Sequence, residues 1–520
     1  MNFALSIAGA MSIAAALYGS DALAEKAGFA EAVDDGNLAS ASPSESSSVE
    51  ISGYFRTRGE VLYNFDLDRG LLASGQPLFP VPAGDPSAQA LRSANMRLRT
   101  DLRLRAPGSG LSVVVRTDLL DNLTLGSTPN LRGGTPAASP GQEAPVQGFR
   151  IKRAYGEALL PIGVLSVGRQ GSHWGLGMVA NGGDCEGCDG GDAADRISFV
   201  TPLVGHIFAL AYDISATGPL QVDHSGSRSI DIEPTDDVQS LTFAFMRYHS
   251  EVARKRRGRA GRVTVEYGAY LSHRWQDKDI PSSYLGDEIR IGPNSIVHRG
   301  FSATATDAWF RLSTANLRIE AEAAYLRANV DQGSLVPGVE FYDALTSNQF
   351  GAALESELTF SRLTVGLDAG SASGDPSPGF GAQPDDLQAA PPFDTHIDNF
   401  RFHTDYRVDK ILFREIIGTV TDAMYLRPHL RFPLADASGA KLVFDAAAIA
   451  SWAIEATSTP SGQKALGIEF DPTLRYETRD GFVAALEYAI LLPLGGFDNP
   501  VSGLDARSAQ LWRLHLRFPF

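Results

Sequence analysis

The sequence has few cysteines, no excess of basic residues and, after its first residues, no long apolar run. Its 2 cysteines allow at most one disulfide. The formal net charge is −16 and basic residues alternate with apolar ones, which argues against nucleic-acid binding. After Tyr18 no apolar run reaches the roughly 20 residues that a membrane helix needs, so we expect no helical anchor. No segment shows the period of an amphipathic helix.

The chain is long, and its polar and apolar residues alternate. Its 520 residues exceed one ordinary globular core, which favours several soluble domains or one large closed architecture. In residues 95–106 the even positions are apolar or nearly so and the odd positions are polar, mostly arginine. A period of two predicts a strand with two different faces. A soluble sheet would turn the arginines to water, whereas a membrane barrel would turn the leucines to lipid and the arginines to a wet lumen.

The N-terminal residues indicate export. Residues 3–18 are apolar or small, and Ala22-Leu23-Ala24 fits a small-x-small cleavage site, so we predict a signal peptide at 1–24. No lysine or arginine precedes the apolar run, which leaves a chance apolar leader as the alternative. Residues 25–48 are rich in alanine, serine and acidic residues without any period, and we predict a disordered periplasmic linker there.

The remaining residues, 49–520, alternate between short and long connections. Short turns fall at positions such as 161–163 and 479–480, and polar stretches such as 371–420 are long. This asymmetry predicts an all-β protein, a closed antiparallel transmembrane β-barrel of about 18 strands with short periplasmic turns and long extracellular loops. The end of the chain resembles the C-terminal strand signal of bacterial outer-membrane proteins, because one face carries Trp512, Leu514, Leu516, Phe518 and Phe520.

Closure of the barrel would make the first and last strands neighbours, with their polar faces toward the lumen. We predict a strongly basic wall lined by Arg56, Arg58, Arg97, Arg99, Arg103, Arg105, Arg513 and Arg517. Roughly across the barrel we predict an acidic wall of Glu320, Glu322, Glu355, Glu357 and Asp368. Opposed walls would create a transverse field that selects polar solutes. The alternative is that these charges only neutralise one another in a solvated lumen.

Two connecting segments are candidates for a gate or plug. Residues 371–420 either fold inward and constrict the pore or form a flexible external loop. Residues 184–192 hold both cysteines, and outside the cytoplasm Cys185 and Cys188 are expected to form a local disulfide. Zinc would need two further ligands, and no histidine pair stands at a matching spacing. The acids of this segment form a solvated loop or, as a weaker candidate, a calcium site: Asp184, Glu186, Asp189 and Asp192.

Catalysis at the outer rim belongs to another class of function. Ser272 precedes His273 and Ser172 precedes His173, each near a strand end. Neighbours on a strand point to opposite faces, so a serine beside a histidine in sequence says little. We predict that the protein is not an enzyme and needs no cofactor. A barrel enzyme or an adhesin is the less favoured alternative.

Several motifs resemble bacterial outer-membrane channels of the porin and alginate-export type. They are Val167-Gly168-Arg169-Gln170, Arg153-Ala154-Tyr155-Gly156-Glu157, Asp195-Arg196 and Ala369-Gly370-Ser371-Ala372-Ser373-Gly374-Asp375. With Phe520, the resemblance spans most of residues 49–520. The export family passes an acidic polysaccharide outward through an arginine-rich pore, and Arg153 and Arg169 would match its inward arginines. The loop at 184–192 departs from that family and leaves the substrate open.

These observations predict an integral pore of the outer membrane for polar or anionic solutes. The resemblance favours export of an acidic exopolysaccharide, and a general or substrate-specific diffusion porin is the alternative. The expected partners are outer-membrane lipid, the solute or polysaccharide, and a periplasmic partner if the pore exports. The mechanism is passive, because an arginine wall lowers the electrostatic cost of an anion and many weak contacts release it again.

Overall fold

A computed structural model describes residues 48–71, 77–82, 89–126, 148–280, 296–334, 338–376, 395–437 and 439–520, with the isolated positions 75, 84, 128–129 and 142–143. The predicted signal peptide at 1–24 and the predicted linker at 25–48, except its last residue, lie outside the described residues. Among the described residues, no helix is long and apolar enough to cross a membrane.

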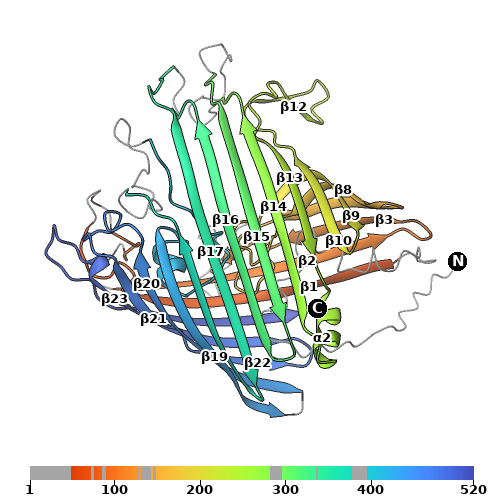
Figure 1. The fold of residues 1–520 in the computed structure, drawn as a ribbon. Coiled ribbons are helices and arrows are strands. Elements are labelled where there is room, and N and C mark those ends of the chain that lie inside the picture. Colours follow the sequence, from red (N-terminus) through yellow and green to blue (C-terminus); the bar gives the residue numbers. More distant parts are fainter. Residues whose placement is uncertain are drawn as a thin grey trace.

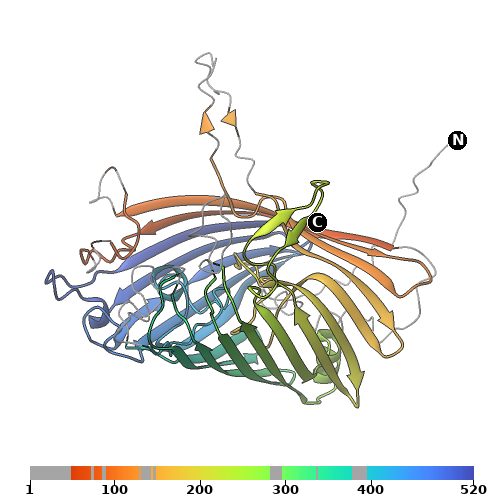
Figure 2. The ribbon, with the colours of Figure 1, turned by 90° about the horizontal axis from the view of Figure 1, so that it is seen from above.

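One antiparallel sheet of 18 strands closes on itself to form a barrel (Figures 1 and 2). The prediction of a closed barrel is therefore confirmed. Two of the 18 strands are interrupted and consist of two segments each. In one, β3 and β4 both pair with β2, and in the other, β21 and β22 both pair with β20 and β23. The pieces are β1 (Ser48–Tyr63), β2 (Ala90–Arg105), β3 (Leu111–Asp118), β4 (Leu123–Thr124), β7 (Arg150–Leu160), β8 (Gly163–Gly171), β9 (Ala193–Leu203), β10 (His206–Asp213), β13 (Gln239–Arg247), β14 (Thr264–Gln276), β15 (Phe301–Ser313), β16 (Leu317–Val330), β17 (Leu345–Phe360), β18 (Leu363–Ala372), β19 (Ala423–Ala437), β20 (Ala440–Ala453), β21 (Ala465–Phe470), β22 (Thr473–Thr478), β23 (Val483–Pro493) and β24 (Ala509–Pro519).

Smaller elements lie in the connections between these strands. Two short hairpins pair β5 (Thr128–Pro129) with β6 (Gln142–Glu143) and β11 (Leu220–Val222) with β12 (Ser229–Asp231). Seen from above, the first hairpin projects away from the barrel (Figure 2). The helical elements are α2 (Glu251–Arg259), the π-helical turn η6 (Leu412–Ile416) and the 3₁₀ turn η7 (Gly495–Phe497).

The connections sort by length between the two ends of the barrel. Short turns such as 161–162 and 361–362 lie at one end, and long segments such as 172–192 and 214–238 lie at the other. Because β1 begins and β24 ends at the short-turn end, both ends of the barrel sequence lie there. This agrees with the predicted division into short periplasmic turns and long extracellular loops.

The connection between β13 and β14 is an exception, because it contains the helix α2. No helix was expected there, since the segment has no apolar period. The helix forms because its ends are well capped: the Ser250 side chain accepts a hydrogen bond from the Ala253 N–H, at 3.3 Å. Glu251 lies in the first turn and arginines lie in the last turn, which suits the helix dipole.

The barrel closes through the pairing of β1 with β24. Tyr54 lies opposite Pro519 and Tyr63 lies opposite Gln510, so the two strands pair over ten positions. At the end of this ladder the Gly53 N–H donates to the Phe520 carbonyl at 3.1 Å, and the Phe520 N–H donates to the Gly53 carbonyl at 3.0 Å. Closure leaves no sheet edge with unpaired backbone groups, which lipid could not satisfy.

The two faces of each strand differ in polarity. In β24 Trp512 and Leu514 are each 49% exposed on the outside, whereas Arg513 is 2% exposed on the inside. In β2 Leu104 is 40% exposed and Arg97 is fully buried. The strand at 95–106 therefore turns its leucines outward to lipid and its arginines inward to the lumen.

Two long connections fold back into the barrel. We name them the disulfide loop (172–192), which joins β8 to β9, and the aromatic loop (395–422), which leads into β19. The buried Ile411 and Leu412 of the aromatic loop share one apolar cluster with Met178 of the disulfide loop and with Ile449 and Leu491 of the wall. The main apolar core therefore lies inside the barrel. Of the two alternatives for residues 371–420, the described part follows the inward one.

We predict that a side chain at Gly53 impairs folding of the barrel. A Cβ atom there would collide with the Arg99 carbonyl and with the Phe520 ring, whereas a Cβ at Gly59 on the same strand meets nothing within 4 Å. Overpacking typically costs about 1–3 kcal/mol. Urea unfolding in phospholipid vesicles should show this loss of stability for Gly53→Val and little change for Gly59→Val. Equal behaviour of the two variants would contradict the importance of this closing contact.

Candidate functional site

Arginines from adjacent strands meet on the inner wall where the barrel closes. Arg56 of β1 lies directly opposite Arg97 of β2 on one side and Arg517 of β24 on the other. Arg56 is 1% exposed and Arg97 is fully buried, so both charges are removed from water. Like charges opposite each other on a sheet repel, and buried charges need partners. We call Arg56, Arg58, Arg97, Arg99 and Arg513 the arginine wall.

The carboxylates of the disulfide loop supply those partners. Asp189 lies 3.2 Å from Arg56 Nη2 and 3.0 Å from Arg58 Nη1. Asp184 contacts Arg153 of β7 at 2.9 Å and also pairs with Arg116 of β3, the strand next to β2. The acids of residues 184–192 are therefore not a solvated external loop, since they dock onto the inner wall.

Glu186 of the disulfide loop contacts basic side chains on the C-terminal strands of the barrel. Its carboxylate lies 2.6 Å from Arg475 Nη1 of β22 and 3.3 Å from His515 Nδ1 of β24. Together with Asp184 and Asp189, it covers the inner wall from β3 to β22 by way of the closing strands.

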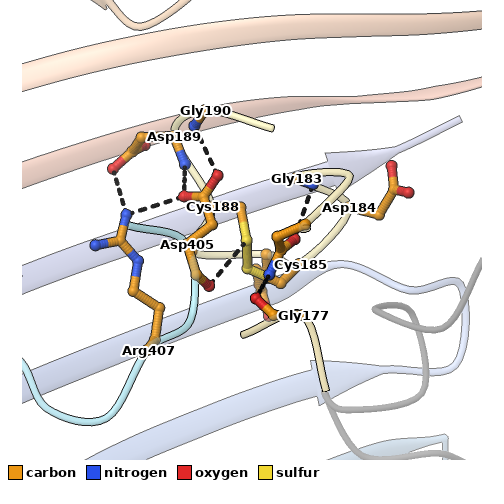
Figure 3. Close-up of a disulfide and its surroundings, with 12 residues drawn as sticks. Gly177, Gly183, Asp184, Cys185, Cys188, Asp189, Gly190, Asp405 and Arg407 are labelled. Atoms are coloured by element: carbon orange, nitrogen blue, oxygen red, sulfur yellow. Dashed lines mark hydrogen bonds and ion pairs between the residues drawn. A yellow bond between two sulfur atoms is a disulfide. The ribbon is translucent and has the colours of Figure 1, made fainter. Parts of the chain in front are cut away.

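Backbone carbonyls of the loop add a second layer of hydrogen bonds. Arg97 donates to the Cys188 carbonyl at 2.8 Å and to the Asp189 carbonyl at 3.0 Å, and Arg99 donates to the Gly183 carbonyl at 2.9 Å. Cys185 and Cys188 form a disulfide within this turn, with their Cα atoms 5.1 Å apart (Figure 3). The disulfide ties the turn that presents these carbonyls to the wall.

The aromatic loop locks the disulfide loop from its other side. The Asp405 carboxylate accepts the backbone N–H groups of Asp189 at 2.9 Å and Gly190 at 3.1 Å (Figure 3). Arg407 donates to Asp405 at 3.1 Å, and Arg414 donates to the Gly187 carbonyl at 3.2 Å. The two loops therefore form one interlocked body across the lumen, which we call the plug.

Charges in the plug keep their ionised forms through this pairing. Burial alone would raise the pKa of the Asp189 carboxyl, but Arg58, Arg414 and Arg56 outweigh it and hold that pKa well below its ordinary value. Burial lowers the pKa of Arg414 to about 9, assisted by the nearby Arg513 charge. Both groups are therefore charged at neutral pH, and their attraction contributes to docking of the plug.

The predicted acidic residues also lie on the inner face, and four of the five, all except Glu322, pair with a basic residue on the same wall. Glu320 lies 2.7 Å from Arg311, and Arg318 lies 3.0 Å from Glu355 and 3.4 Å from Glu357. Charges are thus balanced locally along each wall, which corresponds to the neutralisation alternative rather than to two opposed walls.

Two further acidic positions complete this wall. Asp368 pairs with Arg427 and lies 3.3 Å from His429. Glu322 is 1% exposed and accepts the Leu176 backbone N–H, so it anchors the disulfide loop on the far side of the lumen. Trp174 of the same loop donates to Asp307 at 2.8 Å.

The remaining predicted arginines divide into inward and outward positions. Arg103 and Arg105 lie toward the short-turn end, 3.9 Å from Glu157 and 2.8 Å from Glu50. Arg517 lies over the Tyr54 ring, 4.9 Å from its centroid. The expectation that Arg169 lines the pore needs correction. It shares the outer face of β8 with the exposed Val167 and forms an exposed ion pair with Asp195 at 2.8 Å.

The proposed calcium ligands of the disulfide loop face cations instead of one another. Asp184, Glu186 and Asp189 contact arginines as described, and Asp192 lies 3.3 Å from His403 Nε2. Each of these carboxylates is therefore paired with a basic side chain of the protein, and the four do not converge on a shared ion site. Among the described residues, the one carboxylate group with the spacing of a metal site lies elsewhere, in the connection between β10 and β13.

The serine and histidine pairs do not converge on a shared site. Ser272 is buried on the inner face, where the Thr242 hydroxyl donates to it at 3.2 Å. His273 lies on the opposite face, where its Nδ1 is 2.9 Å from the Thr304 hydroxyl. In the disulfide loop, His173 Nδ1 accepts the Gly182 backbone N–H at 3.4 Å, and the Ser172 N–H donates to Asp192.

Two cavities flank the plug along the wall from β14 to β19. The first has a volume of about 530 Å³ near the long-loop end, with Phe301, Leu326 and Val330 among its apolar lining and Arg274 on its rim. The second, of about 270 Å³, lies near the short-turn end and is lined by charged residues including Arg318 and Glu357. The aromatic loop lines both cavities, the first through Phe400 and the second through Tyr406.

Comparison with known proteins gives likeness of fold alone. No protein-family model matches the chain, and no curated protein matches its sequence. Among solved structures, OccAB1 of Acinetobacter baumannii aligns with a TM-score of 0.48 and 11% identity, covering 90% of this chain and 96% of that one. OprD of Pseudomonas aeruginosa aligns at 0.46 and 9%, covering 92% and 95%. A BenF-like porin of Pseudomonas fluorescens Pf-5 aligns at 0.45 and 9%, covering 91% and 98%.

The class of the protein follows from its own strand pairing and surface. A closed barrel with an apolar outer face and a polar interior is an integral protein of the outer membrane. The predicted localisation is therefore confirmed. The motif resemblance to alginate exporters stays an expectation, because likeness of fold alone does not test it.

We predict that Arg99→Ala strongly destabilises the barrel. Arg99 donates to Asp118 through two nitrogens at 2.7 and 2.9 Å, and Asp118 is fully buried. Removing one partner of a buried pair costs about 3–5 kcal/mol. Arg169→Ala is the matched control, because Arg169 makes the same two-nitrogen contact with Asp195 on the exposed surface, where such pairs contribute about 0–1 kcal/mol. Urea unfolding that ranks the two variants equally would contradict this assignment.

Proposed function

We propose that the protein is a selective diffusion channel for small solutes, and that it does not export a polysaccharide. The observation that carries this proposal is the plug, whose two loops interlock across the lumen and dock on both walls. A solute must pass beside the plug or displace part of it. The cavities of about 530 and 270 Å³ on its two sides suit a small molecule better than a polymer chain.

The arginine wall supports the same choice. An exported polyanion would need a continuous row of available guanidinium groups. Here Arg56 and Arg58 bind Asp189, Arg97 binds loop carbonyls, and Arg99 binds Asp118. A polyanion would have to displace those partners one after another. The wall therefore holds the plug in place, and its role as a polysaccharide track is disfavoured.

The cavity at the long-loop end indicates which solutes enter. Its lining combines apolar side chains such as Phe301 and Leu326 with the hydroxyl of Ser347 and the amide of Gln349. Arg274 extends from β14 to its rim, and within the described residues no acid lies at ion-pair distance from it. We propose that small solutes carrying a negative charge and an apolar part are admitted preferentially, since a cation with an apolar wall attracts both.

We predict that Asp189→Asn opens the channel and increases its preference for anions. The change keeps the size of the side chain and removes the charge that binds Arg56, Arg58 and Arg414. Freed guanidinium groups should loosen the plug and attract anions. Planar-bilayer recording should therefore show a several-fold higher conductance and a reversal potential shifted toward anions under a salt gradient.

The matched control is Asp195→Asn, which breaks an equally short pair on the outer face. It should leave conductance and selectivity unchanged. If Asp189→Asn behaves like this control, the plug does not limit passage. If the unaltered barrel passes uronic-acid oligomers into vesicles as readily as monomers, the export hypothesis replaces this proposal.

A further inference from the structure

One buried carboxylate outside the lumen has no partner. Asp236 lies in the extracellular connection between β10 and β13 and is 1% exposed. In the described part of the chain, neither of its carboxylate oxygens has a hydrogen-bond partner. Buried polar atoms are nearly always satisfied, and an exception indicates a water or an ion. The carboxylate is also tightly enclosed, because a Cβ atom at Gly218 would collide with Oδ2.

Two further carboxylates converge on the same point. Oxygens of Asp231, Asp236 and Asp237 all lie within 4.8 Å of one another. Asp231 and Asp237 are held by the backbone, since Oδ1 of Asp231 accepts the Glu233 N–H at 3.0 Å and Oδ1 of Asp237 accepts the Thr217 N–H at 2.7 Å. Three clustered carboxylates repel one another when ionised unless a cation lies between them.

Within the described residues, no cation of the protein lies at ion-pair distance from Asp236. The charged groups that act most strongly on Asp236 are Asp231, Asp237, Glu233 and Asp279, and all four are acidic. The nearby Lys278 lies 3.6 Å from Glu233, and Arg299 pairs with Asp279. Burial and the four acids raise the pKa of Asp236 to about 6, so this group is still mostly ionised at neutral pH.

We propose that Asp231, Asp236 and Asp237 form a Ca²⁺ site in the extracellular loop. Carboxylates without any nitrogen or sulfur ligand select a hard cation. A loop supplies ligands with less rigid geometry than the octahedron that Mg²⁺ requires, which favours Ca²⁺. The bound ion would hold β12 against the segment before β13. That segment is itself fixed to β14, because Gln276 donates to the Asp236 carbonyl at 2.6 Å.

The test is Ca²⁺ binding to the full chain, refolded in detergent and freed of metal. Isothermal titration with CaCl₂ should show one saturable site, with a dissociation constant on the order of 10⁻⁴–10⁻³ M as in extracellular calcium modules. Asp236→Asn, which keeps the shape of the side chain, should weaken binding at least tenfold. Asp231→Asn should weaken it as well. Mg²⁺ should bind more weakly than Ca²⁺.

The matched control is Asp223→Asn in the same connection, whose carboxylate binds Ser225 and Arg228 instead of the cluster. It should bind Ca²⁺ as the unaltered chain does. Ca²⁺ should also slow proteolysis within 214–238 in the unaltered chain but not in Asp236→Asn. The proposal is overturned if the unaltered chain shows no saturable binding, if Asp236→Asn binds equally well, or if Mg²⁺ binds more tightly. Protection of the loop by acidification alone, without any effect of Ca²⁺, would also overturn it.

Discussion

The structure depends on neutralising the arginines that closure brings together. Pairing of β24 with β1 places Arg56 between Arg97 and Arg517, and the first two are withdrawn from water. Such an arrangement is stable only if anions and carbonyl oxygens reach each guanidinium. The disulfide loop provides both, through Asp189 and through the backbone of residues 183–189. The same contacts that make closure tolerable therefore also place a plug in the lumen.

The plug explains why one barrel can be both tightly packed and selective. The aromatic loop adds an apolar core inside the barrel, so the interior is stabilised by burial as well as by ion pairs. Its contacts to the disulfide loop combine apolar packing around Met178 with directed polar bonds, such as the carboxylate of Asp405 on two backbone N–H groups. Separation of the two loops would break these directed bonds while each loop keeps its contact with the wall. A solute path along that seam needs a smaller change than removal of the whole plug.

The barrel was predictable from the sequence because alternation repeats along the strands. The sequence also offered two plug candidates, but it did not show where the acids of residues 184–192 would dock. Residues 95–106 show which side chains share a face, and a closed sheet then fixes which strands become neighbours. The position of residues 184–192 in the lumen depends on ion pairs between acids and arginines that are far apart in sequence, such as Asp189 and Arg58. No local period carries that information. The one signal in the sequence for this docking was charge complementarity: the glycine-rich loop holds several acids, and the inner wall holds several arginines. At Arg169 alternation was the better guide than motif likeness, because Leu165 and Val167 share its face.

The same electrostatic rule separates the plug from the proposed calcium site. Asp184 and Asp189 are partly buried acids whose oxygens each contact guanidinium groups, so they need no ion from solution. Asp236 is more deeply buried, at 1% exposed, and the charged groups that act most strongly on it are acids. From the sequence, a weaker calcium candidate was expected in residues 184–192 and none in 231–237, although both segments are rich in aspartate. What distinguishes them is whether the fold brings a basic strand face opposite the loop. Inside the barrel it does, and at the extracellular rim beside β12 the missing positive charge must come from outside the chain.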